Sequence, residues 1–388
     1  MNKVLDLACQ LISRPSVTPN DAGCQDLIAA HLTNLGFSVE FLRFGQVTNL
    51  WAKLGDASPT FCFAGHTDVV PPGDISKWHT SPFRPTVRGN RLVGRGVADM
   101  KAAIAAFLVA TETFLHRHTD FEGAIAFLLT SDEEGEAKDG TLRVVETLQA
   151  RHQAIDFCLI GEPTSKQYLG DTIKVGSRGS LTGHLVIKGK QGHIAYPHLA
   201  INPIHGLGRA IRVLSETTWD TGNQYFEPTS WQACYLHADS GAVNVIPQSS
   251  ELTFNFRFSV ESTVDSLKKR LTALLDQQHL QYEIHWTLSS NPFIDEVGYL
   301  AKTLQATVGS VTGQPSQFST KGGASDGHFL CQIAKELLEF GLLDSTIHQT
   351  NECSPIEDIN QLTAIYTLLL QNILCGQKKM NVAQTNIV

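Results

Sequence analysis

The segment FLLTSDEEGEAKDG (Phe127–Gly140) places three adjacent acids, Asp132, Glu133 and Glu134, directly after an apolar run. Runs of acids are common in solvated turns, so this feature alone does not define a site. The apolar residues before it predict a buried β-strand, however. Carboxylates at the end of a buried strand indicate a site at the edge of a sheet, provided that other strands end in similar residues.

Composition excludes several classes of protein. The chain has 388 residues, of which 42% are hydrophobic and 18% charged, as expected for a globular protein with two domains. A net charge of −8 without basic clusters argues against a nucleic-acid partner. The longest apolar run, residues 102–110, is shorter than the roughly 20 residues that cross a bilayer. Asp6 interrupts the apolar N-terminal stretch, which predicts an amphipathic helix, not a signal peptide, and a cytoplasmic protein.

The first part of the chain alternates apolar runs with helical patterns. We expect strands near residues 39–44, 49–53, 59–70, 123–131 and 156–163, and helices near residues 21–35, 100–116 and 141–150. Strands separated by helices of this length imply right-handed crossovers. The pattern therefore predicts an α/β domain with a central, mostly parallel sheet flanked by helices.

The pattern changes after residue 177. Period-2 strands surrounding helices near residues 202–217 and 264–278 predict an inserted α+β sandwich of the ferredoxin-like type. The expected domains are thus a discontinuous catalytic domain, residues 1–177 and 292–376, and an inserted domain, residues 178–291. Ser354 and Glu357, around Pro355, predict a capping box at the start of the last helix. Residues 377–388 are polar and are expected to be disordered.

Metal-ligand side chains follow three of the predicted strands: His66 and Asp68 in FAGHTDVV, Glu133 and Glu134 in LLTSDEEG, and Glu162 in LIGEP. Because parallel strands align their carboxyl ends along one edge, these side chains are expected to converge. His66 and Asp68 are two residues apart and project to the same side. We therefore expect Asp68 to accept the proton of the imidazole nitrogen that faces away from a metal.

Two further residues complete the predicted centre. Asp99, just before a helix, can bridge two cations with its two carboxylate oxygens, and His348 in STIHQTNEC could complete a second site. Imidazoles mixed with carboxylates suit zinc, with cobalt or manganese as alternatives. Paired ions about 3.5–4 Å apart lower the pKa of a bridging water and polarise a carbonyl, while Glu133 is free to transfer the proton. Taken singly, Asp99 could instead be a helix N-cap and Glu162 a turn residue.

Six motifs together resemble the two-zinc aminoacylase/carboxypeptidase-like family: GHTDVVPPGD, GRGVADMK, LLTSDEEG, IGEPTS, QGHIAYPHLAINPIH and EFGLLDSTIHQTNEC. The resemblance extends nearly to Cys375. It implies two zinc ions per subunit, for which Co²⁺ may substitute. One would be held by His66 and Glu162 and the other by Glu134 and His348, with Asp99 between them. The resemblance also implies that Asp68 orients His66 and that Glu133 is the general base.

In the same family the inserted domain is a lid and dimerisation module. The resemblance therefore implies a homodimer in which His193 reaches the neighbouring subunit's site and stabilises the oxyanion. The expected contacts to substrate carboxylates are Arg178, Tyr196, Asn244 and Arg257. A lid surface or an inter-strand ion pair would explain these four equally well.

The implied reaction is hydrolysis of N-succinyl-LL-2,6-diaminopimelate, with a related N-acyl amino acid such as acetylornithine as the alternative. The sequence departs from the family pattern in KGGASDGHF, where Ala324 and His328 replace a threonine and an arginine. Asp344 stands where an asparagine is frequent. These departures concern the acyl group and leave the predicted metal ligands unchanged.

Two other functions compete with this interpretation. GASDG matches the G-x-S-x-G pattern, and Ser325, Asp344 and His348 follow in the chain order of an α/β-hydrolase triad. SQFSTKGG is a poor strand, however, and no HGGG-type loop is present. A non-catalytic binding module would be expected to lack the general base, but Glu133 is intact.

Nucleotide binding is not indicated, because neither GRGVAD nor GHLVIKGKQ makes a nucleotide-binding loop.

Overall fold

The structure is a computed structural model and is described here for residues 2–375. The predicted disorder of residues 377–388 lies outside this range. Contacts divide the chain into two compact units. The first unit comprises the residues up to Gly176, Asp295–Ser319 and the residues from Ser325 onward, and the second unit comprises Ser177–Ile294 and Thr320–Ala324.

The boundaries of the second unit differ slightly from the expected inserted domain. Strand β16 (Phe293–Ile294) belongs to this unit because it pairs with β9 (Gly176–Ser177). Thr320–Ala324 belongs to it because the Thr320 hydroxyl donates to the Tyr225 carbonyl at 2.5 Å. Both connections are long-range pairings, which local sequence patterns do not report.

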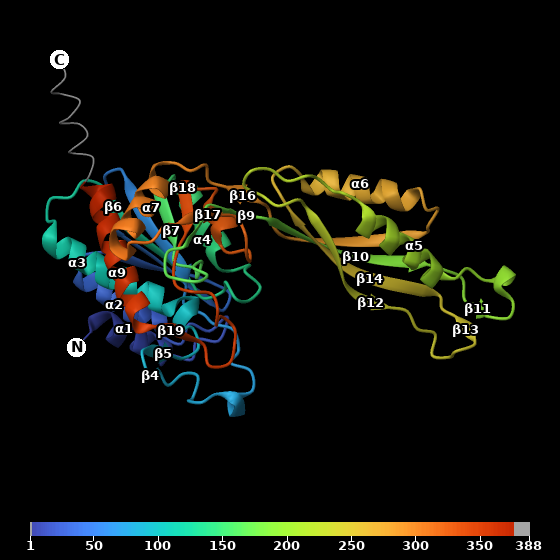
Figure 1. The fold of residues 1–388 in the computed structure, drawn as a ribbon, viewed down its shortest axis with the longest axis horizontal. Helices are drawn as coiled ribbons and strands as arrows, with labels where there is room; N and C mark the ends of the chain where they lie inside the picture. The colour runs from blue at the N-terminus through green and yellow to red at the C-terminus, as the bar shows by residue number, and fades with distance from the viewer. Residues whose placement is uncertain (1, 376–388) are drawn as a thin grey trace, which may run out of the picture. The chain divides into compact units, whose positions relative to one another are not determined.

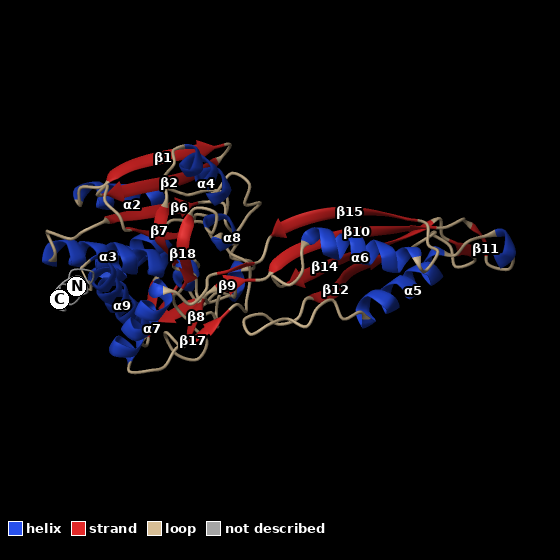
Figure 2. Cartoon of the chain, turned by 90° about the horizontal axis from the view of Figure 1, so that it is seen from above, coloured by secondary structure: helices blue, strands red, loops and turns tan. Residues whose placement is uncertain are grey.

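The first unit is built on a mixed eight-stranded sheet (Figures 1 and 2). Strands β6, β3, β7 and β18 run parallel through its centre, as predicted, whereas β1, β2 and β6 are joined by antiparallel pairings at one edge. In spatial order, the strands are β1 (Ser38–Phe44), β2 (Val47–Leu54), β6 (Ala124–Thr130), β3 (Thr60–His66), β7 (Ile155–Ile160), β18 (Ala334–Glu339), β8 (Thr172–Lys174) and β17 (Gln317–Ser319).

Helices surround this sheet. They are α1 (Lys3–Ile12), α2 (Cys24–Asn34), α3 (Ala102–Arg117), α4 (Thr141–Ala150), α7 (Tyr299–Thr312), α8 (Gly327–Leu330) and α9 (Ile356–Leu374). Every residue of β3 and β6 is buried, which explains why these strands appear in the sequence as continuous apolar runs. Aromatic rings join sheet and helices in one core: Phe63 stacks on Phe107 of α3 with centroids 4.4 Å apart, and Tyr366 of α9 lies against both rings.

The predicted capping box at the last helix is wrong. Helix α9 begins at Ile356, and Ser354 lies in β19 (Cys353–Pro355). This strand pairs with β5 (Arg91–Val93), which in turn pairs with β4 (Thr86–Arg88). Pairing with β5 keeps Ser354 in an extended strand, so its side chain is not placed to cap the helix.

The second unit has the predicted ferredoxin-like topology. Its antiparallel sheet has the order β12 (Ser230–His237), β14 (Ser249–Phe258), β10 (Gly179–Lys188) and β15 (Tyr282–Ser290). Buried and more accessible residues alternate along β14, so one face of the sheet packs in the core. Helices α5 (Pro203–Glu216) and α6 (Val264–Asp276) supply Leu207 and Leu271 to that core. A short ribbon, β11 (Gly192–His193) paired with β13 (Val245–Ile246), extends the unit.

Helices long and apolar enough to cross a bilayer are absent from the part of the chain that the structure describes.

Candidate metal centre

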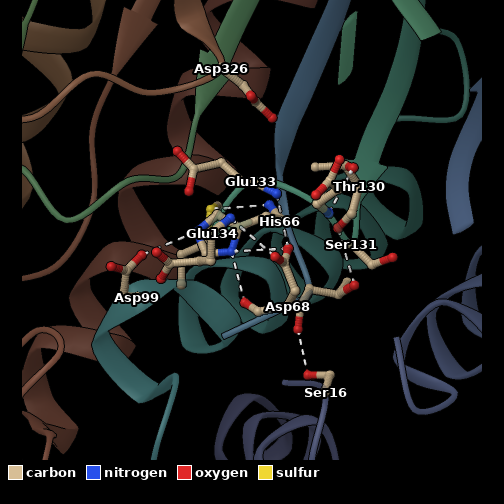
Figure 3. Close-up of polar contacts among 12 residues, drawn as sticks. Ser16, His66, Asp68, Asp99, Thr130, Ser131, Glu133, Glu134 and Asp326 are labelled. Atoms are coloured by element: carbon tan, nitrogen blue, oxygen red, sulfur yellow. Dashed lines mark hydrogen bonds and ion pairs between the residues drawn. The ribbon is translucent and has the colours of Figure 1, made fainter. Parts of the chain in front are cut away.

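Three neighbouring parallel strands deliver the predicted ligands to one edge of the sheet. His66 is the last residue of β3, Glu133 and Glu134 follow β6, and Glu162 follows β7. Strand β3 lies between β6 and β7, and its register pairs His66 with Thr130. The residues that follow these strands in the sequence therefore meet around His66, as Figure 3 shows for Glu133 and Glu134.

Asp99 lies between the two histidines. It belongs to the buried turn Val97–Lys101 that leads into α3. Its Oδ1 lies 3.1 Å from Nε2 of His66, and its Oδ2 lies 3.1 Å from Nε2 of His348. Glu162 Oε1 lies 3.5 Å from the same nitrogen of His66, and Glu134 Oε1 lies 2.9 Å from that of His348. The two groups of ligand side chains thus share Asp99.

The donor set fits cations. Within each of the groups His66–Asp99–Glu162 and Asp99–Glu134–His348, the potential ligand atoms lie within 4.8 Å of one another. Each group combines one imidazole with two carboxylates, a set that suits zinc and similar ions. Each group can therefore hold one divalent cation, with Asp99 serving both.

The pKa values of both histidines are raised, because the surrounding carboxylates stabilise positive charge at this position. Hydrogen bonds to Asp99 and Glu134 raise the pKa of His348 to about 10. Burial would lower the pKa of His66, but Asp99 and Glu162 raise it well above its ordinary value. The two imidazolium ions in turn hold the pKa of Asp99 below its usual range despite its burial. Protons on the histidines supply the positive charge that metal ions would supply when bound.

The Asp68 carboxylate accepts hydrogen bonds from backbone N–H groups and not, as predicted, from the His66 imidazole. The Nδ1 of His66 is 2.8 Å from the backbone carbonyl oxygen of Asp68, whereas the Asp68 carboxylate lies 3.7 Å away. That carboxylate instead accepts the backbone N–H groups of Glu134 at 3.1 Å and Glu133 at 3.4 Å. The expectation that the Asp68 side chain accepts the imidazole proton is therefore wrong, because the nearer main-chain oxygen takes that position. The Asp68 side chain fixes the loop that follows β6.

Glu133 lies in an environment that suits proton transfer. It is grouped with His66 and Glu134, and burial raises the pKa of its carboxyl well above the ordinary value. His66 opposes this rise, whereas Glu162, Asp326 and Glu134 add to it. Burial likewise raises the pKa of Glu162 to about 7 and that of Asp326 to about 7. A carboxylate with a raised pKa can both accept and return a proton near neutral pH.

Sequence patterns missed several residues that surround the centre. Asp326 is buried, accepts a hydrogen bond from the Thr141 hydroxyl at 2.6 Å, and lies near Glu133 (Figure 3). Met100 receives the backbone N–H of His66 on its sulfur at 3.4 Å. A Cβ on Gly65 would overlap the Met100 side chain, so a glycine at that position allows this close approach. No period or spacing in the sequence marks these neighbours.

The predicted residues of the second unit fall into two separate groups. Arg178 precedes β10, and Arg257 pairs with Ser180 near the start of that strand. His193, Tyr196 and Asn244 lie beyond its far end: the His193 and Tyr196 rings are 5.6 Å apart, and Ile194 N–H donates to the Asn244 carbonyl at 3.1 Å. Strand β10 has ten residues, so the two groups are separated by roughly 30 Å. One unit cannot present both groups to the same small molecule.

The side chains of the rival serine triad have other partners. The Ser325 hydroxyl donates to Glu339 at 2.6 Å, Asp344 pairs with Lys166, and His348 faces Asp99 and Glu134. The triad is therefore not formed.

Among the departures from the family pattern, His328 places its Nδ1 2.6 Å from the Ser325 carbonyl oxygen. Arg178, a proposed carboxylate contact, lies 3.9 Å from Glu227.

The fold and the site define the class of protein: a metal-dependent hydrolase. Residues 62–372 match the model of peptidase family M20/M25/M40, and the chain belongs to this family. A succinyl-diaminopimelate desuccinylase of Thiobacillus denitrificans is 54% identical over 373 residues, covering 96% of this chain and 95% of that protein. One from Methylobacillus flagellatus is 52% identical over 374 residues, covering 96% and 100%.

Solved structures share the fold at low sequence identity. An M20 family metallo-carboxypeptidase from Sulfolobus solfataricus matches with a TM-score of 0.78 at 17% identity, covering 96% of this chain and 99% of that chain. A Bacillus subtilis protein described as a dinuclear metal binding peptidase of the M20 family matches with a TM-score of 0.70 at 16% identity, covering 96% and 97%. The family resemblance inferred from the motifs is confirmed.

Proposed function

We propose that this protein removes the succinyl group from N-succinyl-LL-2,6-diaminopimelate, giving succinate and LL-2,6-diaminopimelate. The observation that carries this proposal is identity above 50% with desuccinylases over nearly the whole length of both chains. The position of Asp99, with one oxygen toward each histidine, supports it. The reaction would belong to the biosynthesis of diaminopimelate and lysine.

The proposed roles of the residues follow from their positions. His66 and Glu162 would hold one zinc ion and Glu134 and His348 the other, with one Asp99 oxygen for each, and Co²⁺ could substitute. When bound, such a pair of ions lowers the pKa of a bridging water and polarises the amide carbonyl. Glu133 would take a proton from the attacking water and return it to the leaving amine.

A homodimer is the second part of the proposal. Arg178 and Arg257 are separated from His193, Tyr196 and Asn244 by the length of β10, so a site that uses both groups needs two copies of the second unit. The segment that carries His193 and Tyr196 also exposes large apolar side chains, as a contact surface would. They are Ile194, Tyr196, Leu199 and Ile201, each more than half exposed. In the proposed dimer His193 stabilises the oxyanion in the partner's site.

Each unit would then have its own task. The first unit, with the metal centre, would be the catalytic domain, and the second unit would be the lid and dimerisation module.

Cys24, Cys62 and Cys158 are buried thiols, which favours a reducing compartment and hence the cytoplasm.

Substrate comparison tests the proposed function directly. The zinc-loaded protein should show a higher kcat/KM for N-succinyl-LL-2,6-diaminopimelate than for acetylornithine or simple N-acyl amino acids. Acetylornithine is the principal alternative because Ala324 and His328 depart from the family pattern beside Ser325. A preference for acetylornithine would replace the proposed substrate while retaining the metallohydrolase mechanism.

A further inference from the structure

Glu352 is a buried carboxylate on which four hydrogen-bond donors converge. It is fully buried, as is its ion-pair partner Arg95, which is 2% exposed. Oε2 of Glu352 accepts Arg95 Nη1 at 2.8 Å and the backbone N–H of Gly96 at 2.9 Å. Oε1 accepts the backbone N–H of Ala98 at 2.8 Å and of Asp99 at 3.1 Å. One carboxylate therefore holds the backbone of Gly96, Ala98 and Asp99, in the turn that carries the shared metal ligand.

The same residue is connected to the opposite ligand. Glu352 follows His348 by four residues in the chain, and its partner Arg95 also approaches the His348 carbonyl oxygen through Nη2, at 3.5 Å. The loop between them is closed by Thr346, whose hydroxyl donates to the Cys353 carbonyl at 2.8 Å. Glu352 and Arg95 thus form a buried connection between the main chain at Asp99 and the main chain at His348.

We propose that Glu352 is a positioning residue for the metal centre. Its carboxylate fixes the Gly96–Asp99 turn and, through Arg95, the main chain of His348, so that the two ligands are held in place before a cation arrives. Groups that orient metal ligands without contacting the metal commonly contribute 10- to 100-fold to metal affinity. This inference rests on the proposed metal function of Asp99 and His348.

The effect should differ between the two sites. Two of the three residues in the Asp99–Glu134–His348 group depend on Glu352, but only one in the His66–Asp99–Glu162 group does. A glutamine at position 352 would keep the size of the side chain but would turn an NH₂ group toward two of the four donors. Those donors would lose their partner in a buried place. The turn at Asp99 would then be free to shift.

A purely structural buried ion pair would stabilise the fold without affecting metal binding, so the test needs a matched control. Asp156 accepts the Thr60 backbone N–H at 2.8 Å, the Ser58 hydroxyl at 2.9 Å and Lys335 Nζ at 2.6 Å. It lies at the start of β7, the end of the strand away from Glu162. Asp156→Asn therefore weakens a partly buried carboxylate that also anchors main chain and a basic side chain, but far from the ligands.

The experiment is a Co²⁺ titration of the metal-free protein, followed by visible absorption and by competition with a chelator. We expect wild type and Asp156→Asn to bind two ions. Glu352→Gln should bind one of them about 10- to 100-fold more weakly, and its titration should resemble that of His348→Ala. Melting temperatures of the metal-free proteins measure the structural contribution separately.

If Glu352→Gln does not fold, Glu352→Asp replaces it in the experiment. The aspartate keeps the charge but is too short to reach all four donors, so it should weaken the binding of the same ion.

Two results would overturn the inference in distinguishable ways. If Glu352→Gln or Glu352→Asp loses thermal stability but binds both ions like the wild type, Glu352 is only structural and the proposed function stands. If the wild type itself binds no divalent cation, both the positioning role and the proposed metal centre fail.

Discussion

The carboxylate of Asp68 accepts the backbone N–H of Glu134 at 3.1 Å, so the segment that follows β3 anchors the loop that carries the proposed base. Asp68→Asn would replace one carboxylate oxygen with an NH₂ group, so the backbone N–H of either Glu133 or Glu134 would lose its acceptor. Small misplacements of catalytic groups lower reaction rates by about 10²-fold. We therefore expect kcat to fall by about this factor while the zinc content stays nearly unchanged. Steady-state kinetics and metal analysis check this. Loss of zinc with unchanged kcat per bound ion would show that Asp68 acts through His66 instead.

Glu133→Gln tests the proton shuttle. The amide keeps the shape of the side chain but cannot accept the proton, so kcat should fall by about 10²- to 10⁴-fold while both metal ions stay bound. Glu136→Gln, an exposed acid in the same loop, is the control and should retain wild-type turnover. Equal turnover in the two variants would remove Glu133 from the mechanism.

Metal binding should release protons. In the metal-free protein the pKa of His348 is about 10 and that of Glu162 about 7, so at neutral pH His348 carries a proton and Glu162 does so in part. A cation needs the neutral imidazole and the ionised carboxylate, and zinc affinity should therefore rise with pH between about pH 6 and pH 8. Calorimetry in buffers of different ionisation enthalpy measures the protons released. An affinity independent of pH would contradict this account of the cluster.

The trans role of His193 is testable by mixing variants. His193→Ala should lower kcat far more than zinc content. Subunits carrying His193→Ala and subunits carrying Glu133→Gln should each be nearly inactive, yet mixed dimers should recover activity, because one site then combines an intact Glu133 with the partner's intact His193. His198→Ala, an exposed histidine in the same segment, is the control. If mixing restores nothing although mixed dimers form, His193 does not act across the interface.

Residues at the ends of buried strands were predictable from the sequence. The apolar runs before His66, Glu133 and Glu162 mark β3, β6 and β7, and parallel strands bring their ends to one edge. The ferredoxin-like order of the second unit also follows from its succession of elements. In both cases the information lies in local periodicity combined with general rules of topology.

Features that depend on long-range partners were not predictable. The antiparallel pairing of β2 with β6 and the strand at Ser354 arise from pairings between distant segments. The spacing of His66 and Asp68 correctly places them together, but it cannot show that a main-chain oxygen reaches the imidazole first. Glu352 is one of many acids in the sequence, and only the fold reveals the four donors around it.

The most direct test of the central claim is a zinc titration of the metal-free protein, with turnover of N-succinyl-LL-2,6-diaminopimelate measured at each step. We expect no hydrolysis without metal, saturation at two zinc ions per chain, and crystallographic density for both ions around Asp99. Undiminished hydrolysis in the presence of a strong chelator, or zinc bound away from Asp99, would contradict it.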